Sequence, residues 1–126
     1  MKVRITEYLD LDLDKELWCC HSCGKELGAV RENYKHFTLV YDRDPHEIHK
    51  PYIDPESSPV GHSCSPDPEW CRILEFYCPN CATMFEVEYL PPGHPPTHDI
   101  ELDIDALKAR HQTRSTKTVN NVKPQR

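Results

Sequence analysis

Two pairs of cysteines have the type and spacing of metal ligands. Cys20 and Cys23 form one C-x2-C pair, and Cys78 and Cys81 form a second. Two residues between cysteines allow one tight turn to direct both sulfur atoms at one ion, and two such turns complete a tetrahedral shell. The sequence therefore predicts a four-thiolate structural zinc site. Because sulfur fills every position, we expect no catalysis at this metal.

The residue after each pair bears on the shape of the turn. Gly24 follows the first pair and adopts unusual backbone angles without strain. Ala82 follows the second pair, so we expect slight strain or a different turn there.

Other interpretations of the two pairs remain open at this stage. Paired knuckles also hold iron in rubredoxin-like electron carriers, and a lone C-x2-C pair is typical of dithiol redox centres. Cys19 is adjacent to Cys20 and could replace it as a ligand, although its spacing to Cys23 fits a knuckle less well.

Further histidines and cysteines lie outside the two pairs. His62, Cys64 and Cys71 could form a second metal site, but their spacing matches no metal-binding motif, and free thiols are the simpler interpretation. His94 and His98 lie in a proline-rich stretch, where packing at a surface or an interface is the default expectation.

Short strands must position the two pairs. Apolar-rich runs over Arg72–Tyr77 and Met84–Leu90 flank the second pair and predict a hairpin, as in zinc ribbons. Residues 2–13 alternate between apolar and polar positions, which predicts a half-buried strand with a bulge or break near Thr6–Tyr8. On that strand, the side chains of Asp10, Asp12 and Asp14 should share one solvated acidic face.

The remaining segments predict little regular structure. We expect a strand over His36–Tyr41, a short helix over Asp44–Lys50 with Asp44 as N-cap, and a final strand over Asp99–Asp103. Residues 51–69 read as a long irregular excursion. The prolines that follow Leu90 predict an extended course, and residues 106–126 should be disordered or weakly helical.

Composition indicates one small domain with a thin core. Hydrophobic residues make up 37% of the 126, below the roughly 45–50% of an average globular chain. Twelve prolines and four glycines favour extended segments over long helices. We therefore predict a mainly β fold: a zinc-ribbon-like domain over residues 1–105 with long proline-rich arms, and an extended basic C-terminal tail over residues 106–126.

Charge is divided unevenly along the chain. Residues 106–126 contain six basic residues and no acidic ones, so residues 1–105 keep 9 basic against 21 acidic residues, a net charge of 9 − 21 = −12. An acidic body repels nucleic acid, so the tail should lie on an acidic surface of this chain or of a partner. A free-standing zinc ribbon that binds nucleic acid or protein is the alternative.

Motifs that the sequence lacks bear on where the protein is located and on which reactions it could catalyse. No apolar run approaches the roughly 20 residues of a membrane helix, and the N-terminus does not resemble a signal peptide, so we expect a cytoplasmic protein with reduced thiols. Neither a phosphate-binding loop nor a nucleophile elbow occurs. These features favour an accessory subunit without its own active site.

Several stretches together resemble a known family. They are the C-x2-C-G knuckle, Asn33-Tyr34-Lys35, Pro68-Glu69-Trp70, the run Leu74-Glu75-Phe76-Tyr77-Cys78-Pro79 leading to Cys81, Glu86-Val87-Glu88 and Pro91-Pro92-Gly93. The resemblance, over about residues 16–105, is to the small gamma subunit of the ATP-dependent ketone carboxylases that act on acetone and acetophenone. The length of the chain, its middle segment and Ala82 favour the acetophenone branch.

The resemblance implies a role in a large hetero-oligomer related to hydantoinases. Such complexes carboxylate a ketone to a 3-oxo acid with bicarbonate and ATP, without biotin. It implies that larger subunits carry the nucleotide and substrate chemistry. The zinc-ligand role transfers to the four paired cysteines, and no catalytic residue transfers.

Overall fold

Two antiparallel sheets make up the body of the protein. The computed structural model describes residues 1–49 and 65–121, with side chains through residue 112. Its elements are β1 (Lys2–Arg4), β2 (Leu9–Asp12), β3 (Leu17–Cys20), β4 (Glu26–Ala29), the 3-10 helix η1 (Tyr34–Phe37), β5 (Leu39–Arg43), α1 (Pro45–Ile48), β6 (Arg72–Tyr77), β7 (Met84–Leu90) and α2 (Ile104–Asn121). The mainly β fold class is confirmed.

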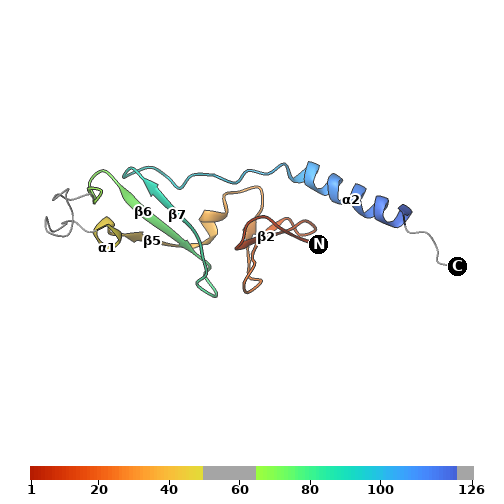
Figure 1. The fold of residues 1–126 in the computed structure, drawn as a ribbon, viewed down its shortest axis with the longest axis horizontal. Helices are drawn as coiled ribbons and strands as arrows, with labels where there is room; N and C mark the ends of the chain where they lie inside the picture. The colour runs from red at the N-terminus through yellow and green to blue at the C-terminus, as the bar shows by residue number, and fades with distance from the viewer. Residues whose placement is uncertain (50–64, 122–126) are drawn as a thin grey trace, which may run out of the picture.

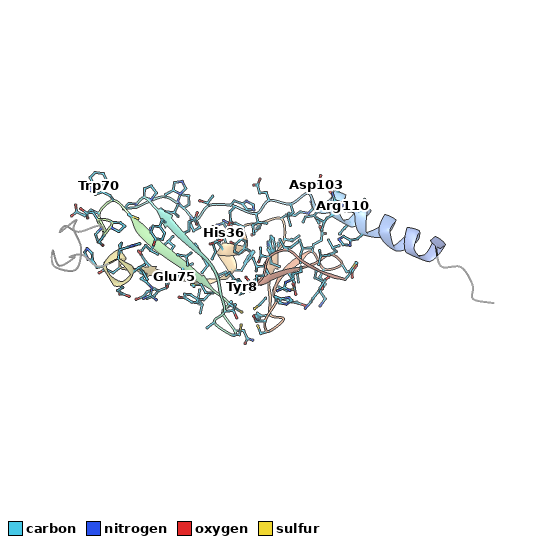
Figure 2. All side chains as sticks on the ribbon, viewed as in Figure 1. Tyr8, His36, Trp70, Glu75, Asp103 and Arg110 are labelled. Atoms are coloured by element: carbon cyan, nitrogen blue, oxygen red, sulfur yellow. The ribbon has the colours of Figure 1, made fainter. Side chains whose placement is uncertain are left out.

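The first four strands form one sheet and the last three form the other. The strand orders are β1-β2-β3-β4 and β5-β6-β7, and every pairing is antiparallel. Figure 1 shows the two sheets side by side, with η1 between them and α2 projecting beyond the N-terminal sheet. Figure 2 places Tyr8 at the first sheet and Glu75 within the second. The predicted hairpin has its expected bounds.

The predicted break in residues 2–13 is a turn between two strands. The Thr6 hydroxyl oxygen accepts hydrogen bonds from the Tyr8 and Leu9 backbone N–H groups, at 3.2 and 3.0 Å. This local turn folds β1 back onto β2, where Val3 pairs with Leu11.

The acidic face expected on this segment is only partly solvated. Asp12 is buried, and one of its carboxylate oxygens accepts hydrogen bonds from the Asp14 and Lys15 backbone N–H groups. The expectation was wrong for Asp12 because its side chain closes the turn between β2 and β3 instead of facing water.

The strand expected over His36–Tyr41 begins later. Asn33 caps η1 by accepting a hydrogen bond from the Lys35 N–H group, so the chain is helical through Phe37 and β5 starts at Leu39. The short helix after Asp44 is confirmed over Pro45–Ile48, with the Asp44 side chain accepting from the His46 N–H group at 3.0 Å.

Two expectations about the C-terminal part were wrong. Residues 99–103 form no strand, and the chain from Ile104 to Asn121 is the helix α2, not an extended tail. The Asp103 carboxylate accepts from the Ala106 N–H group at 3.0 Å, and Ile104 is buried in the core. A capped first turn anchored by an apolar residue starts the helix, which the polar composition of the later residues does not predict.

The proline-rich segment after β7 lies against the body. Residues 94–103 have no regular secondary structure, but the Asn33 side-chain amide donates to the carbonyl oxygens of Pro96 and Thr97. The long proline-rich arms are therefore not confirmed, and most of the 51–69 excursion lies outside the described residues. None of the described helices is long and apolar enough to span a membrane.

One hydrophobic core joins both sheets. Its buried residues come from β2, β3, β7, η1 and α2, and include Leu11, Trp18, Tyr34, Phe85 and Ile104. Cys20 and Cys78 belong to the same cluster. The two cysteine turns therefore meet where the sheets pack together, so the fold of both sheets positions the candidate site.

Candidate metal centre

Each cysteine pair occupies the turn of a β-hairpin. Cys20 is the last residue of β3, and β4 begins shortly after Cys23. Cys78 directly follows β6, and Cys81 lies just before β7. The second hairpin was predicted from sequence, whereas the first was not, because β4 (Glu26–Ala29) has little apolar alternation.

The two turns share one backbone hydrogen-bond pattern. The Gly24 N–H group donates to the Cys20 carbonyl oxygen at 2.8 Å, and the Ala82 N–H group donates to the Cys78 carbonyl oxygen at 3.0 Å. In the reverse direction, the Cys20 N–H group donates to the Lys25 carbonyl oxygen and the Cys78 N–H group to that of Thr83. Two equivalent knuckles therefore face each other.

The fifth residue of each knuckle has left-handed backbone angles. Gly24 has φ of +78° and Ala82 has φ of +62°. Glycine takes this conformation without strain. An alanine in this conformation is destabilised by roughly 1 kcal/mol, because its Cβ atom lies close to the following carbonyl oxygen. The expected strain at Ala82 is confirmed.

The four sulfur atoms converge on one point. Cys20 Sγ lies 3.6 Å from Cys81 Sγ, and Cys23 Sγ lies 3.7 Å from Cys78 Sγ. All four sulfur atoms lie within 4.8 Å of one another. Four sulfur atoms at about 2.3 Å from a tetrahedral zinc ion would be about 3.8 Å apart, whereas a disulfide needs about 2.05 Å. The donor set and its spacing fit a tetrahedral metal ion.

The site is half buried. Cys20 and Cys78 are buried in the core, whereas Cys23 and Cys81 are exposed. A metal ion would therefore be held at the edge of the core, between two buried and two exposed sulfur atoms.

Local hydrogen bonds and burial act differently on the thiols. Burial raises the pKa of Cys20 to about 12. The Asn80 side chain lowers the pKa of Cys23 to about 6, and the Thr83 hydroxyl, 3.0 Å from Cys81 Sγ, lowers the pKa of Cys81. Asn80 and Thr83 thus favour thiolates at the exposed positions, and neither was singled out from the sequence.

Cys19 is not part of the cluster. It neighbours Cys20 within β3, so its side chain faces the other side of the strand, where it is fully buried and burial raises its pKa. Its sulfur lies 3.9 Å from the Leu17 carbonyl oxygen. Replacement of Cys20 by Cys19 as a ligand is contradicted by this geometry.

Of the other candidate residues, those within the described part of the chain are not brought together with the four cysteines. His62 and Cys64 lie outside the described residues, and Cys71 is partly buried with its sulfur 3.9 Å from the Arg72 carbonyl oxygen. His98 pairs with Glu101 at 3.1 Å, and His94 contacts the Pro95 carbonyl oxygen.

A buried ionic cluster beside the core was not predicted from the sequence. Lys35 is almost fully buried, and its Nζ lies 2.9 Å from a Glu88 oxygen and 3.4 Å from an Asp99 oxygen. The Tyr34 hydroxyl donates to Asp99 at 3.3 Å. Burial raises the pKa of Tyr34, and the nearby Asp99 carboxylate adds to the effect. The Asn33-Tyr34-Lys35 and Glu86-Val87-Glu88 stretches were the available signal.

Comparison with known proteins decides the family. The model of the family described as "Acetone carboxylase gamma subunit" matches residues 3–112, most of the chain. The chain belongs to this family. The resemblance carried by the knuckles and the Asn33-Tyr34-Lys35 stretch is therefore confirmed.

Two proteins named as carboxylase subunits are similar to the chain. It is 59% identical to the acetophenone carboxylase beta subunit of Aromatoleum aromaticum over 109 residues, which cover 86% of this chain and 81% of that protein. It is 31% identical to the acetone carboxylase gamma subunit of Xanthobacter autotrophicus over 86 residues, which cover 68% of this chain and 46% of that protein. Both relatives are named as subunits of carboxylases.

Proposed function

We propose that this chain is a small zinc-binding, non-catalytic subunit of an ATP-dependent, biotin-independent ketone carboxylase. The observation that supports it best is the convergence of four cysteine sulfur atoms in a member of the acetone carboxylase gamma subunit family. The whole assembly would be a ligase that carboxylates a ketone to a 3-oxo acid. This chain would contribute shape and binding surface to it.

Acetophenone is the proposed substrate of the assembly. The 59% identity to an acetophenone carboxylase subunit, against 31% to an acetone carboxylase subunit, supports this branch. The greater share of the relative that the chain covers, 81% against 46%, points the same way.

The proposed ligands are Cys20, Cys23, Cys78 and Cys81, and the proposed ion is zinc. Four thiolates with sulfur separations of 3.6 and 3.7 Å match its tetrahedral preference. The shell is closed by protein sulfur, so the ion would have no position for water or ketone. Its role would be structural.

The metal would hold the two sheets together. Cys20 and Cys23 belong to the first sheet's β3–β4 turn, and Cys78 and Cys81 to the second sheet's β6–β7 turn. Binding of zinc by such sites contributes about 10–16 kcal/mol in small peptides, which equals or exceeds the net stability of a typical domain. This contribution would compensate for the thin core.

The test is expression of the chain with the larger subunits encoded in its native source, followed by metal analysis and native mass measurement. We expect one zinc per copy of this chain, a colourless protein and a hetero-oligomer that carboxylates acetophenone when ATP and bicarbonate are supplied. Visible absorbance with stoichiometric iron would replace zinc with a rubredoxin-like centre. A purified monomer that never joins larger subunits would refute the proposal.

A further inference from the structure

One face of the three-stranded sheet, called the open face below, carries exposed apolar side chains among the described residues. Tyr41 of β5 pairs with Glu75 of β6, and Glu75 pairs with Val87 of β7, so these three side chains share a face. The same register places further residues on this face. Its apolar and aromatic side chains, called the apolar set below, are Leu39, Tyr41, Tyr77, Met84, Val87 and Tyr89. All except the partly buried Tyr77 are exposed, from 36% for Val87 to 56% for Leu39.

The chain covers the opposite face of this sheet itself. Leu74, Phe76 and Leu90 are buried there as a small cluster, and Lys35 Nζ lies 5.1 Å from the centre of the Phe76 ring. On the face of Tyr41, by contrast, Ile73 and Glu75 of the central strand are buried, but the large apolar side chains of the two outer strands stay exposed. An exposed row of large apolar side chains on an ordered sheet is typical of an interaction surface.

The one cationic side chain among the described residues of this face, Arg43, is paired with Glu75 of the face and with Glu47 of α1. Arg43 Nε donates to a Glu75 carboxylate oxygen at 2.9 Å, and the Tyr77 hydroxyl donates to the other oxygen at 2.7 Å. The remaining side chains of the apolar set are uncharged.

We propose that this open face binds an apolar, uncharged surface on a larger subunit of the carboxylase, an inference that rests on the proposed function. Because Arg43 is already paired with both Glu75 and Glu47, an anionic partner group buried here would lose its hydration without gaining a free opposite charge. Tyrosine and methionine are also enriched at the centres of protein interfaces. The exposed apolar side chains of this face are therefore complementary to an apolar partner surface.

The occupant is an unlike subunit and not a second copy of this chain. The relatives are named as beta and gamma subunits, so their assemblies contain other kinds of subunit. A two-fold dimer of this chain through the same face is a distinct arrangement with a distinct mass.

The sheet offers a matched pair of variants for the test. Val87→Asp places a charge on the open face, and Val40→Asp makes the same change on the opposite face, because Val40 pairs with Phe76. Both valines are exposed, at 36% and 50%, and both lie on edge strands. Tyr41→Asp is a second variant on the open face, on a different strand from Val87.

The measurement is the dissociation constant between this chain and the larger subunits, with zinc content and thermal unfolding of each variant as controls for folding. We expect Val87→Asp and Tyr41→Asp each to weaken binding at least about tenfold and Val40→Asp to leave it within about twofold. Equal binding of Val87→Asp and Val40→Asp would overturn the inference and leave the proposed function intact. A wild-type chain that joins no larger subunit would overturn both.

The mass of the isolated chain separates the two occupants. A wild-type monomer that binds the larger subunits supports the inference. The opposite result would be a stable homodimer that the Val87→Asp substitution dissociates, while this variant still binds the larger subunits as tightly as the wild type. That result would assign the face to a second copy of this chain and overturn the inference.

Discussion

Cys23 Sγ and Cys78 Sγ lie 3.7 Å apart although 55 positions separate the two residues in the chain. Between them the chain leaves the N-terminal sheet, passes through η1 and builds the first two strands of the second sheet. A bond from both sulfur atoms to one ion would therefore fix the two sheets against each other.

Loss of one thiolate should release the metal and much of the stability. We expect Cys78→Ser to retain less than stoichiometric zinc and to lose cooperative unfolding, because metal binding of this kind contributes on the order of 10 kcal/mol. Metal analysis and a thermal melt measure both effects. Cys71→Ser, which changes a thiol outside the cluster, is the control. Full zinc occupancy in a folded Cys78→Ser protein would show that our ligand set is wrong.

Removal of the buried lysine should destabilise the protein strongly. Lys35→Met leaves the Glu88 carboxylate without its ion-pair partner in a largely buried position, which should lower the free energy of unfolding by about 3–5 kcal/mol. Urea denaturation measures the change.

A second substitution and a surface pair provide the controls for Lys35. Adding Glu88→Gln to Lys35→Met should recover part of the loss, because the buried charge is then removed. Lys15→Met breaks an exposed pair with Glu26 and should change stability far less than Lys35→Met does, because solvent screens the exposed pair. Equal effects of Lys35→Met and Lys15→Met would contradict the assignment of a buried ionic cluster.

The Arg43–Glu75 pair predicts a specific acid sensitivity. The Arg43 hydrogen bond lowers the pKa of Glu75 below its ordinary value of 4.5, despite partial burial. A depressed folded-state pKa gives stability that is fully present above pH 4.5 and is lost as the pH falls through the lower, folded-state value. Below pH 4.5, stability should therefore fall less steeply with pH in Glu75→Gln than in the wild type.

Chemical denaturation at a series of pH values tests this prediction. Glu7→Gln, which neutralises an exposed carboxylate, should keep the slope of the wild type. Parallel curves for Glu75→Gln and the wild type below pH 4.5 would rule out Glu75 as the source of the acid sensitivity.

The two knuckles should respond in opposite directions to exchange of glycine and alanine. Ala82→Gly removes the steric strain of a Cβ atom in a left-handed conformation, at φ of +62°, and should stabilise the protein by roughly 1 kcal/mol. Gly24→Ala introduces the same strain at φ of +78° and should destabilise it by a similar amount, since the added Cβ atom meets only the Lys2 ammonium group, at 3.8 Å. Thermal melts of the zinc-loaded proteins measure both changes, and shifts of equal sign would refute the argument.

Features set by neighbouring residues were predictable from the sequence. Asp44 caps α1 through the N–H group of His46, two positions later, and β6 and β7 have their predicted bounds because apolar side chains mark each strand. The left-handed conformation at Ala82 follows from the geometry of a C-x2-C turn. In each case the deciding contact lies within a few residues.

Features set by distant residues were not predictable. Lys35 looks like a surface residue until β7 and the following segment bring Glu88 and Asp99 to it. Residues 106–126 were expected to form a disordered or weakly helical tail, yet Ile104 packs in the core and starts a helix that continues to Asn121.

The sequence by itself determined the donor set, since four cysteines in two C-x2-C pairs specify the chemistry of a closed thiolate site whatever the fold around them. Only the tertiary structure decided that the two pairs meet, that Cys19 points away from them, and that large apolar side chains on one face of the second sheet stay exposed. The physical reason is the distance along the chain between the residues that set each feature. Ligand type and turn geometry are local properties of the chain. Convergence and burial depend instead on which strands pair and which side chains the core then admits.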